Sequence, residues 1–283
     1  MPETDLLVGV VGAGVMGVSL AHAMTAAGIP VILHDTDPAA LESAQAEVAR
    51  ASRLARLSLG RAASEAAPLR TSHDLVDLAP CRLVVENVTE DATIKEAVHR
   101  RLDEVLSPDA IVAVNTSAVP ITSLALVGEH PERVLGAHFM NPVATSSMVE
   151  VVRTSHTSAR SVEILTSVLD RMGKERVVVD DSAGFVINRC LMMFINEAAA
   201  LLDDGVATAA QVDRLFRGCL GHRTGPLRTA DVIGIDTIVD TLHVLSDHLG
   251  PARFTPSARL TSMLRDGHLG QKSGRGFYDY TED

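Results

Sequence analysis

Short apolar runs alternate with helical patterns over the first 180 residues of the chain. The first run ends at a glycine-rich turn, a helical pattern follows through Gly28, and a second run ends at Asp35. Strands that alternate with helices in this way predict βαβ units and a parallel sheet. The runs expected as strands are residues 6–11, 30–35, 82–88, 110–115, 133–138, 148–152 and 175–180.

The pattern changes near Ala183, and helical periodicity fills the rest of the chain. No convincing strand run follows Gly184, which predicts an α/β domain over residues 1–183 and an all-helical domain over residues 184–283. Residues 58–72 carry Gly, Ser and Pro and are expected as a connector. The expected helices are residues 38–56, 91–106, 159–172, 184–205, 209–218 and 230–250.

The glycine-rich turn has the sequence GAGVMG, in which Gly12, Gly14 and Gly17 form a GxGxxG pattern after a strand and before a helix. Such glycines permit a tight turn, a close approach of a pyrophosphate and close helix packing. Asp35 ends the next strand, where an acid binds the ribose hydroxyls of NAD and repels the 2′-phosphate of NADP. A plain glycine turn is the alternative, but the context predicts a Rossmann-type, doubly wound NAD-binding domain.

Composition narrows the class of protein. A net charge of −11 and the lack of a basic stripe argue against a nucleic-acid partner. No apolar run is long enough for a membrane span and no signal peptide is evident, so a cytoplasmic protein is expected. Three scattered cysteines and eleven histidines show no metal-binding spacing, so no metal site is expected. With 46% apolar residues, the chain can form a sizeable core.

Two polar residues interrupt apolar stretches in the segment GAHFMNPVATSSMVEVV. His138 falls where one expected strand should stop, and Glu150 lies in the middle of the next. A buried carboxylate needs a partner, and an imidazole that it orients can accept a proton from an alcohol. A hydrogen-bonded histidine of the core is the alternative interpretation of His138.

Two further candidates lie at domain or strand ends. Ser117 follows the strand expected over residues 110–115, and its hydroxyl is suited to contact a substrate oxygen. The alternative for Ser117 is a helix cap, because NTS precedes Pro120. Asn188 lies at the start of the helical domain, where its alternative role is a hydrogen bond between domains.

Taken together, these motifs resemble the 3-hydroxyacyl-CoA dehydrogenase family, including 3-hydroxybutyryl-CoA dehydrogenases, over essentially the whole chain. The matching segments are VGVVGAGVMG, VVENVTED, NTSAVPITSLA, GAHFMNPV, MVEVV, DSAGFVINR, TGPLRTADVIGIDT and KSGRGFYDY.

The resemblance implies roles for the matched residues. His138 is then the catalytic base and Glu150 its partner, while Ser117 and Asn188 contact substrate and cofactor. It also implies a homodimer formed through the helical domain and a substrate cleft between the domains. The further residues that it assigns to NAD are Glu90, Lys95, Asn115, Asn141 and Lys272.

One departure from the family concerns the carrier of the acyl group. CoA-using members usually carry a lysine-rich tract after the second strand, whereas this chain has ASRLARLSLG, with Ala51 and Ser58 at positions expected to touch CoA. The sequence segments VENVTE, GAHFMNPV and FRGCLGH also resemble those of a polyketide extender-unit subgroup of the family, whose members act on acyl groups carried by acyl carrier protein. Arginines 50, 53 and 56 still allow phosphate binding. Both carriers therefore stay open.

Smaller departures from the family pattern are ATSS after NPV, Arg223-Thr224, and Ala183 in place of a common proline.

The expected reaction is NAD-dependent oxidation of the 3-hydroxyl of a short (S)-3-hydroxyacyl thioester. A 3-hydroxyacid dehydrogenase is disfavoured, because AGFVINRCLMM lacks that family's catalytic-lysine pattern. A non-catalytic NAD-binding protein is disfavoured by the intact His138 and Glu150.

Overall fold

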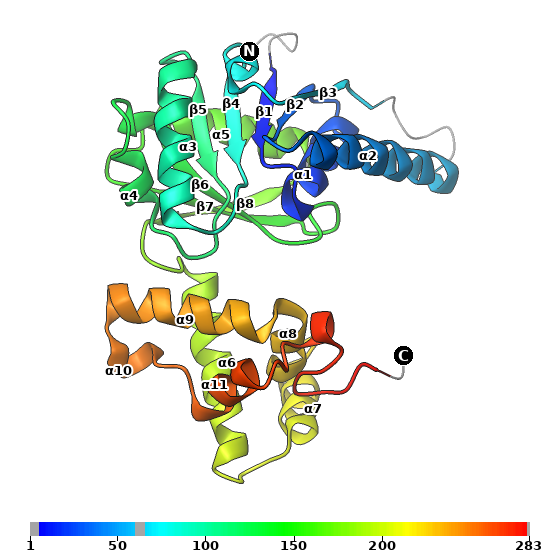
Figure 1. Ribbon diagram of the computed structural model, residues 1–283, viewed down its shortest axis with the longest axis vertical. Coiled ribbons are helices and arrows are strands. Elements are labelled where there is room, and N and C mark those ends of the chain that lie inside the picture. The colour runs from blue at the N-terminus through cyan, green and yellow to red at the C-terminus, as the bar shows by residue number, and fades with distance from the viewer. Residues whose placement is uncertain (1–5, 60–65, 282–283) are drawn as a thin grey trace. The chain divides into compact units, whose positions relative to one another are not determined.

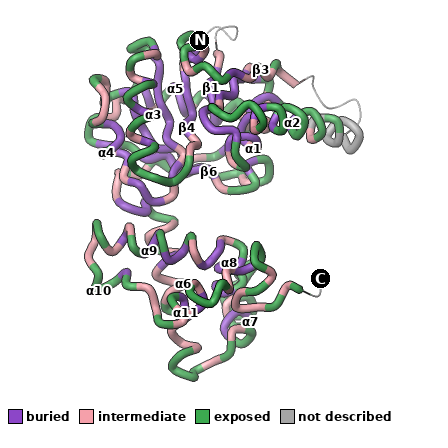
Figure 2. Tube along the Cα trace, in the orientation of Figure 1, coloured by how far each residue is buried: buried purple, intermediate pink, exposed green. Residues whose placement is uncertain are grey.

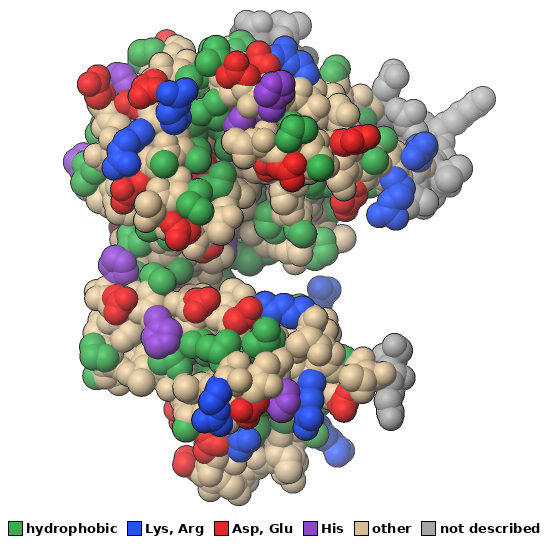
Figure 3. Space-filling model, viewed as in Figure 1, with side chains coloured by type: hydrophobic (Ala, Val, Ile, Leu, Met, Phe, Trp, Pro, Cys, Tyr) green, Lys and Arg blue, Asp and Glu red, His purple; other side chains and the backbone are tan. Residues whose placement is uncertain are grey.

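The computed structural model describes residues 6–59 and 66–281. The chain divides into two compact units, one ending at Ser182 and one beginning at Ala183 (Figure 1). The first unit contains a sheet with helices on both faces, and the second is built from helices. On the face that Figure 3 shows, acidic and basic side chains are interspersed.

Within the described residues, eight strands form one sheet in the order β3-β2-β1-β4-β5-β6-β7-β8. Adjacent strands from β3 to β6 pair in parallel, β7 pairs antiparallel with β6, and β8 pairs parallel with β7. This order confirms the doubly wound, Rossmann-type fold. The strands are β1 Val8–Val11, β2 Val31–His34, β3 Leu69–Ser72, β4 Leu83–Glu86, β5 Ile111–Val114, β6 Val134–Phe139, β7 Met148–Arg153 and β8 Glu175–Asp180.

Two strand predictions need correction. β3 lies inside the segment expected as a connector over residues 58–72, of which residues 60–65 fall outside the described part. Its sequence LRTS has no apolar run because it is an edge strand that pairs with β2 alone in the sheet order. β6 continues to Phe139, one residue past the expected end, so His138 lies within the strand and not at its last position.

Helices cover both faces of the sheet. One core contains buried side chains of α1 Val15–Ala26, α2 Pro38–Leu59 and α5 Ala159–Arg171 packed against the strands. On the other face, Leu78 packs beside Gly9 of β1, and Ile121 beside Gly136 of β6. α3 Ala92–Val105 and α4 Ile121–Ala125 lie on that second face. β1, β2, β4, β5 and β6 are buried throughout, as expected for a sheet with two covered faces, whereas the edge strands β3 and β8 are only partly buried (Figure 2).

The second unit has its own apolar core, to which α6, α8, α9 and α11 all contribute. The helix expected over residues 230–250 is divided in two, because Gly234 adopts φ +104° and separates α8 from α9. No helix in the described ranges is long and apolar enough to cross a membrane. The helices are α6 Ile187–Asp203, α7 Ala209–Leu220, α8 Pro226–Ile233, α9 Ile235–Leu249, α10 Pro251–Phe254 and α11 Ala258–Arg265.

Candidate active site and cofactor pocket

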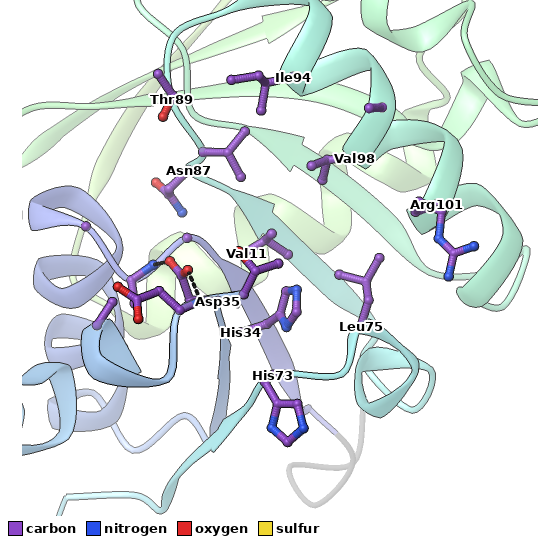
Figure 4. A pocket seen from close by; sticks show the side chains of 18 of the residues that line it. Val11, His34, Asp35, His73, Leu75, Asn87, Thr89, Ile94, Val98 and Arg101 are labelled. Atoms are coloured by element: carbon purple, nitrogen blue, oxygen red, sulfur yellow. Dashed lines mark hydrogen bonds between the residues drawn. The ribbon is translucent and has the colours of Figure 1, made fainter. Parts of the chain in front are cut away.

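A pocket of about 880 Å³ lies at the carboxyl edge of the sheet, between the turn after β1 and the segments that follow β2, β3 and β4. In Figure 4, Ile94 and Val98 point into it from α3, opposite His34 and Leu75. Ligands of doubly wound folds bind at this edge, where the helices of the two faces diverge. A cavity of this size accommodates a nucleotide-sized ligand.

The glycine turn leaves the backbone exposed to that pocket. An added Cβ at Gly12 would lie 2.7 Å from the carbonyl oxygen of Asn87, and one at Gly17 would overlap the carbonyl oxygen of Gly12. These two glycines therefore allow close packing of the turn. A Cβ at Gly14, by contrast, would meet no described atom within 4 Å, so open space faces the start of α1. That space fits a pyrophosphate held by helix N–H groups.

Asp35 follows β2 and is half-buried at the pocket wall. One carboxylate oxygen accepts a hydrogen bond from the backbone N–H of Ala13 at 2.7 Å, and the other from the N–H of Asp37 at 2.9 Å. These bonds fix the carboxylate beside the glycine turn. The residues therefore fit a dinucleotide whose adenosine ribose lies against Asp35.

His138 and Glu150 face each other across the antiparallel pair of β6 and β7. Side chains of a strand alternate between its faces, so both lie on the face where Ile121 packs against Gly136. Nδ1 of His138 lies 3.0 Å from Oε2 of Glu150, and both side chains are buried. An ionised carboxylate only accepts hydrogen bonds, and in the neutral tautomer whose Nδ1–H donates to Glu150, Nε2 keeps its lone pair.

Ser117 lies in the turn after β5, and its hydroxyl is 3.5 Å from Nε2 of His138. It is not the cap of the next helix, because α4 begins after Pro120 and its first N–H groups donate to the carboxylate of Asp181. The Glu90 carboxylate holds the Ser117 turn instead. It accepts from the N–H of Ser117 at 2.8 Å, from the N–H of Ala118 at 3.1 Å and from the hydroxyl of Thr116.

Lys95 is fully buried in the first turns of α3. Its amine donates to both carboxylate oxygens of Glu86, at 3.0 and 3.2 Å, and lies 3.6 Å from Oε2 of Glu90. The side chain of Asn115 is also engaged within the protein. It donates to Oδ1 of Asn87 at 2.7 Å and accepts from the N–H of Phe139 at 3.1 Å.

Asn141 lies on the exposed loop between β6 and β7, in a cis peptide bond with Pro142. Lys174 supports this loop, because its buried amine donates to the carbonyl oxygens of Val143 and Ser146. Burial lowers the pKa of Lys174. The sequence analysis did not identify this lysine, which carries no motif signal.

The remaining candidates belong to the helical unit. Asn188 lies in the first turn of α6. Lys272 is exposed, and its amine pairs with Oδ2 of Asp236 at 2.6 Å, near the start of α9.

Two residues of the first unit, Glu86 and Asp181, were also not predicted from the sequence. Glu86, like Glu150, is a carboxylate within an apolar strand segment, and this pattern predicts a buried partner.

The fold and the pocket define a dinucleotide-binding protein, whose sheet also carries a buried histidine–glutamate pair. Family models for 3-hydroxyacyl-CoA dehydrogenase match the chain twice. The NAD-binding domain matches residues 7–182, and the C-terminal domain matches residues 184–280. The chain therefore belongs to the 3-hydroxyacyl-CoA dehydrogenase family and is an NAD-dependent oxidoreductase.

Named relatives span nearly the whole chain. It is 36% identical to a probable 3-hydroxybutyryl-CoA dehydrogenase of Deinococcus radiodurans, over 96% of this chain and 99% of the relative. It is 37% identical to 3-hydroxybutyryl-CoA dehydrogenase of Bradyrhizobium diazoefficiens, over 96% and 94%. The crystal structure of (S)-3-hydroxybutyryl-CoA dehydrogenase from Ralstonia eutropha matches with a TM-score of 0.91 and 32% identity, over 99% and 100% of the two chains.

Proposed function

We propose that this protein oxidises the 3-hydroxyl of a short (S)-3-hydroxyacyl thioester to the 3-oxo form, with NAD as oxidant. The observation that carries the proposal is the directly opposed, buried pair of His138 and Glu150, with Ser117 beside the second imidazole nitrogen. The names of the relatives support the same substrate class.

His138 accepts the hydroxyl proton of the substrate at Nε2 as hydride leaves C3, and bound NAD supplies the hydride acceptor. Glu150 keeps the proton on Nδ1, orients the ring and stabilises the imidazolium that forms. Ser117 binds the reacting oxygen through its hydroxyl. Asn188 contacts substrate and cofactor in this proposal. The further residues proposed to contact NAD are Asn141, Glu90, Lys95, Asn115 and Lys272.

The test is His138→Ala, with activity followed as NADH formation from a short 3-hydroxyacyl thioester. We expect kcat to fall by about 10²–10⁴-fold, because the proton loses its acceptor. NADH affinity should stay within about threefold of wild type, since the ring lies outside the cofactor pocket's lining. Turnover at the wild-type rate would refute the role of His138. Binding of NADH by wild type without any turnover would instead favour a non-catalytic NAD-binding protein.

The acyl carrier is either CoA or an acyl carrier protein, and we propose the carrier protein as the second candidate. The observation that favours it is the loss of the expected lysines from α2. Arg50 and Arg53 are exposed on that helix, and the side chains of Arg56 and Ser58 lie outside the described residues. A carrier protein presents phosphopantetheine without the adenosine phosphates that those lysines would meet.

Kinetics with one acyl group on both carriers decide between them. Turnover confined to the phosphopantetheinylated carrier protein would support a role in extender-unit biosynthesis. Efficient turnover on CoA would make the protein a 3-hydroxyacyl-CoA dehydrogenase in substrate as well as in family. Loss of that CoA activity in Arg50→Ala and Arg53→Ala would show that these arginines bind the phosphates of CoA.

We further propose that the helical unit forms a homodimer. Val206, Leu215 and Leu220 expose 59–68% of their surface on and beside α7, although each is a large apolar residue. Val206 and Leu215 line the same surface hollow, and contiguous exposed apolar surface is typical of an interface. Light scattering should give a dimer for wild type and a monomer for Leu215→Glu, while Leu126→Glu in the first unit keeps the dimer. A wild-type monomer would contradict the proposal.

A further inference from the structure

Three titratable side chains lie buried between β4 and α3, outside the candidate catalytic pair. Glu86 and Lys95 are 0% exposed, and His99 is 5% exposed. Nε2 of His99 lies 3.7 Å from Oε2 of Glu86 and makes no hydrogen bond within the described residues. Burying a carboxylate and an ammonium is costly even when they pair, so stability alone does not explain their presence.

The amine of Lys95 joins the segments that follow two neighbouring strands. Besides Glu86, it lies 3.4 Å from the carbonyl oxygen of Val88 after β4 and 3.5 Å from that of Asn115 after β5. The Glu86 carboxylate also accepts from the N–H of Val88 at 2.6 Å. One buried ion pair therefore fixes both turns at the carboxyl edge, next to the site.

From Lys95 the contacts continue to Ser117 and to the strand of His138. Glu90 is within 3.6 Å of the Lys95 amine and accepts from the N–H groups of Ser117 and Ala118. Asn115, whose carbonyl faces Lys95, accepts through its side chain from the N–H of Phe139, the residue after His138.

We propose that Glu86 and Lys95 are positioning residues that act through Glu90 on the Ser117 turn and so set the distance between Ser117 and His138. The proposal rests on the roles proposed above for Ser117 and His138. It adds to the contact with NAD that the family resemblance implies for Lys95, because the amine also pairs with buried protein oxygens.

The first experiment compares Glu86→Gln and Lys95→Met with wild type, through kcat, KM for the acyl substrate and NADH affinity by fluorescence. We expect kcat to fall about 10- to 100-fold, because small displacements of reacting groups cost this much. NADH affinity should change by less than about threefold in Glu86→Gln. A tenfold weaker NADH affinity at unchanged kcat in Glu86→Gln would overturn the proposal, because the ion pair would then serve cofactor binding alone.

The matched control is the buried pair of Arg133 and Asp103, whose NH2 and Oδ1 atoms lie 2.7 Å apart at the amino end of β6. Asp103→Asn removes a comparable ion pair away from the Ser117 turn. It should lower the melting temperature and leave kcat within about twofold. An equal kcat loss in Asp103→Asn and Glu86→Gln would overturn the proposal, because general loosening would then explain both.

The second experiment places Glu86→Gln in a Ser117→Ala background. If Glu86 acts through Ser117, the double variant loses little more kcat than Ser117→Ala alone. Multiplicative losses would overturn the positioning role while leaving the function of Ser117 intact. Unchanged kcat in Ser117→Ala itself would instead overturn the role of Ser117, and the positioning inference with it. If Lys95→Met does not fold, Glu86→Gln carries the test, since it preserves size and shape.

Discussion

The Asp35 carboxylate combines a structural and a recognition role at the end of β2. Its two oxygens accept from the N–H groups of Ala13 and Asp37, which ties the glycine turn to the strand end. Its negative charge lies at the pocket wall, where the adenosine ribose of NAD fits and a 2′-phosphate would be repelled. A single side chain thus shapes the turn, and we expect the same side chain to select the cofactor.

We predict that Asp35→Ala weakens NAD binding and reduces the preference for NAD over NADP by about tenfold or more, because both a ribose acceptor and a repulsive charge are lost. The ratio of kcat/KM for the two cofactors measures this. Glu42→Gln, at an exposed residue of α2 outside the pocket lining, is the control and should leave the ratio unchanged. A preserved ratio in Asp35→Ala would contradict the assignment.

Residue types predicted the contact between His138 and Glu150 better than the network around it. A carboxylate within an apolar strand signals a buried partner, and this reasoning identified His138 for Glu150. The same signal at Glu86 was not followed to Lys95, because the contact depends on how α3 packs on β4. Motif matching assigned Lys95 and Asn115 to the cofactor, and the structure adds contacts of both residues with other parts of the protein.

At the scale of elements, α4 shows how a short helix is fixed by a distant residue. α4 has five residues and no capping side chain of its own. Asp181, after β8, accepts from the N–H groups of Ile121 and Thr122, at 3.0 and 2.7 Å, and from the Thr122 hydroxyl at 2.6 Å. The cap satisfies N–H groups that would otherwise be left without partners at the helix start.

We expect Asp181→Ala to lower the free energy of unfolding by about 1–2 kcal/mol, the usual effect of losing a helix cap. The neighbouring Asp180→Ala is the matched control, because Asp180 pairs only with exposed Arg153 in the described ion pairs. It should change stability by less than about 0.5 kcal/mol. Urea unfolding of both variants measures the difference, and equal losses would contradict the capping role.

Periodicity identified most elements, and the exceptions have physical causes. β3 is an edge strand with the sequence LRTS, so no apolar run marks it. Gly234 ends α8 with φ +104°, but a lone glycine inside a helical pattern does not reveal whether the helix continues. Backbone conformation and edge position depend on neighbours that lie far away in the sequence.

For the whole molecule, one buried histidine, His34, contributes to the response to acid. His34 is 5% exposed, its Nδ1 contacts the carbonyl oxygen of Ser72, and burial lowers its pKa below the ordinary 6.5. The unfolded chain therefore binds this proton more readily than the folded chain as pH falls through 6.5. The contribution of His34 to stability is complete above that pH and is lost below it.

We predict that the melting temperature falls between pH 7.5 and pH 5.5 and that His34→Asn makes this fall shallower, because one group that resists protonation is removed. The exposed neighbour His73 supplies the control, and His73→Asn should leave the slope unchanged. Calorimetry at the two pH values measures it. An unaltered slope in His34→Asn would show that other groups govern the acid response.

The sequence by itself determined the alternation of strands and helices, the NAD-binding turn with Asp35, and the change to an all-helical pattern near Ala183, because each depends on local periodicity or spacing. Only the tertiary structure decided that β7 pairs antiparallel with β6, which sets His138 opposite Glu150. It also decided that Lys95 is buried on Glu86. These contacts arise from pairing and packing between distant segments, and periodicity reveals the face of an element but not its partner.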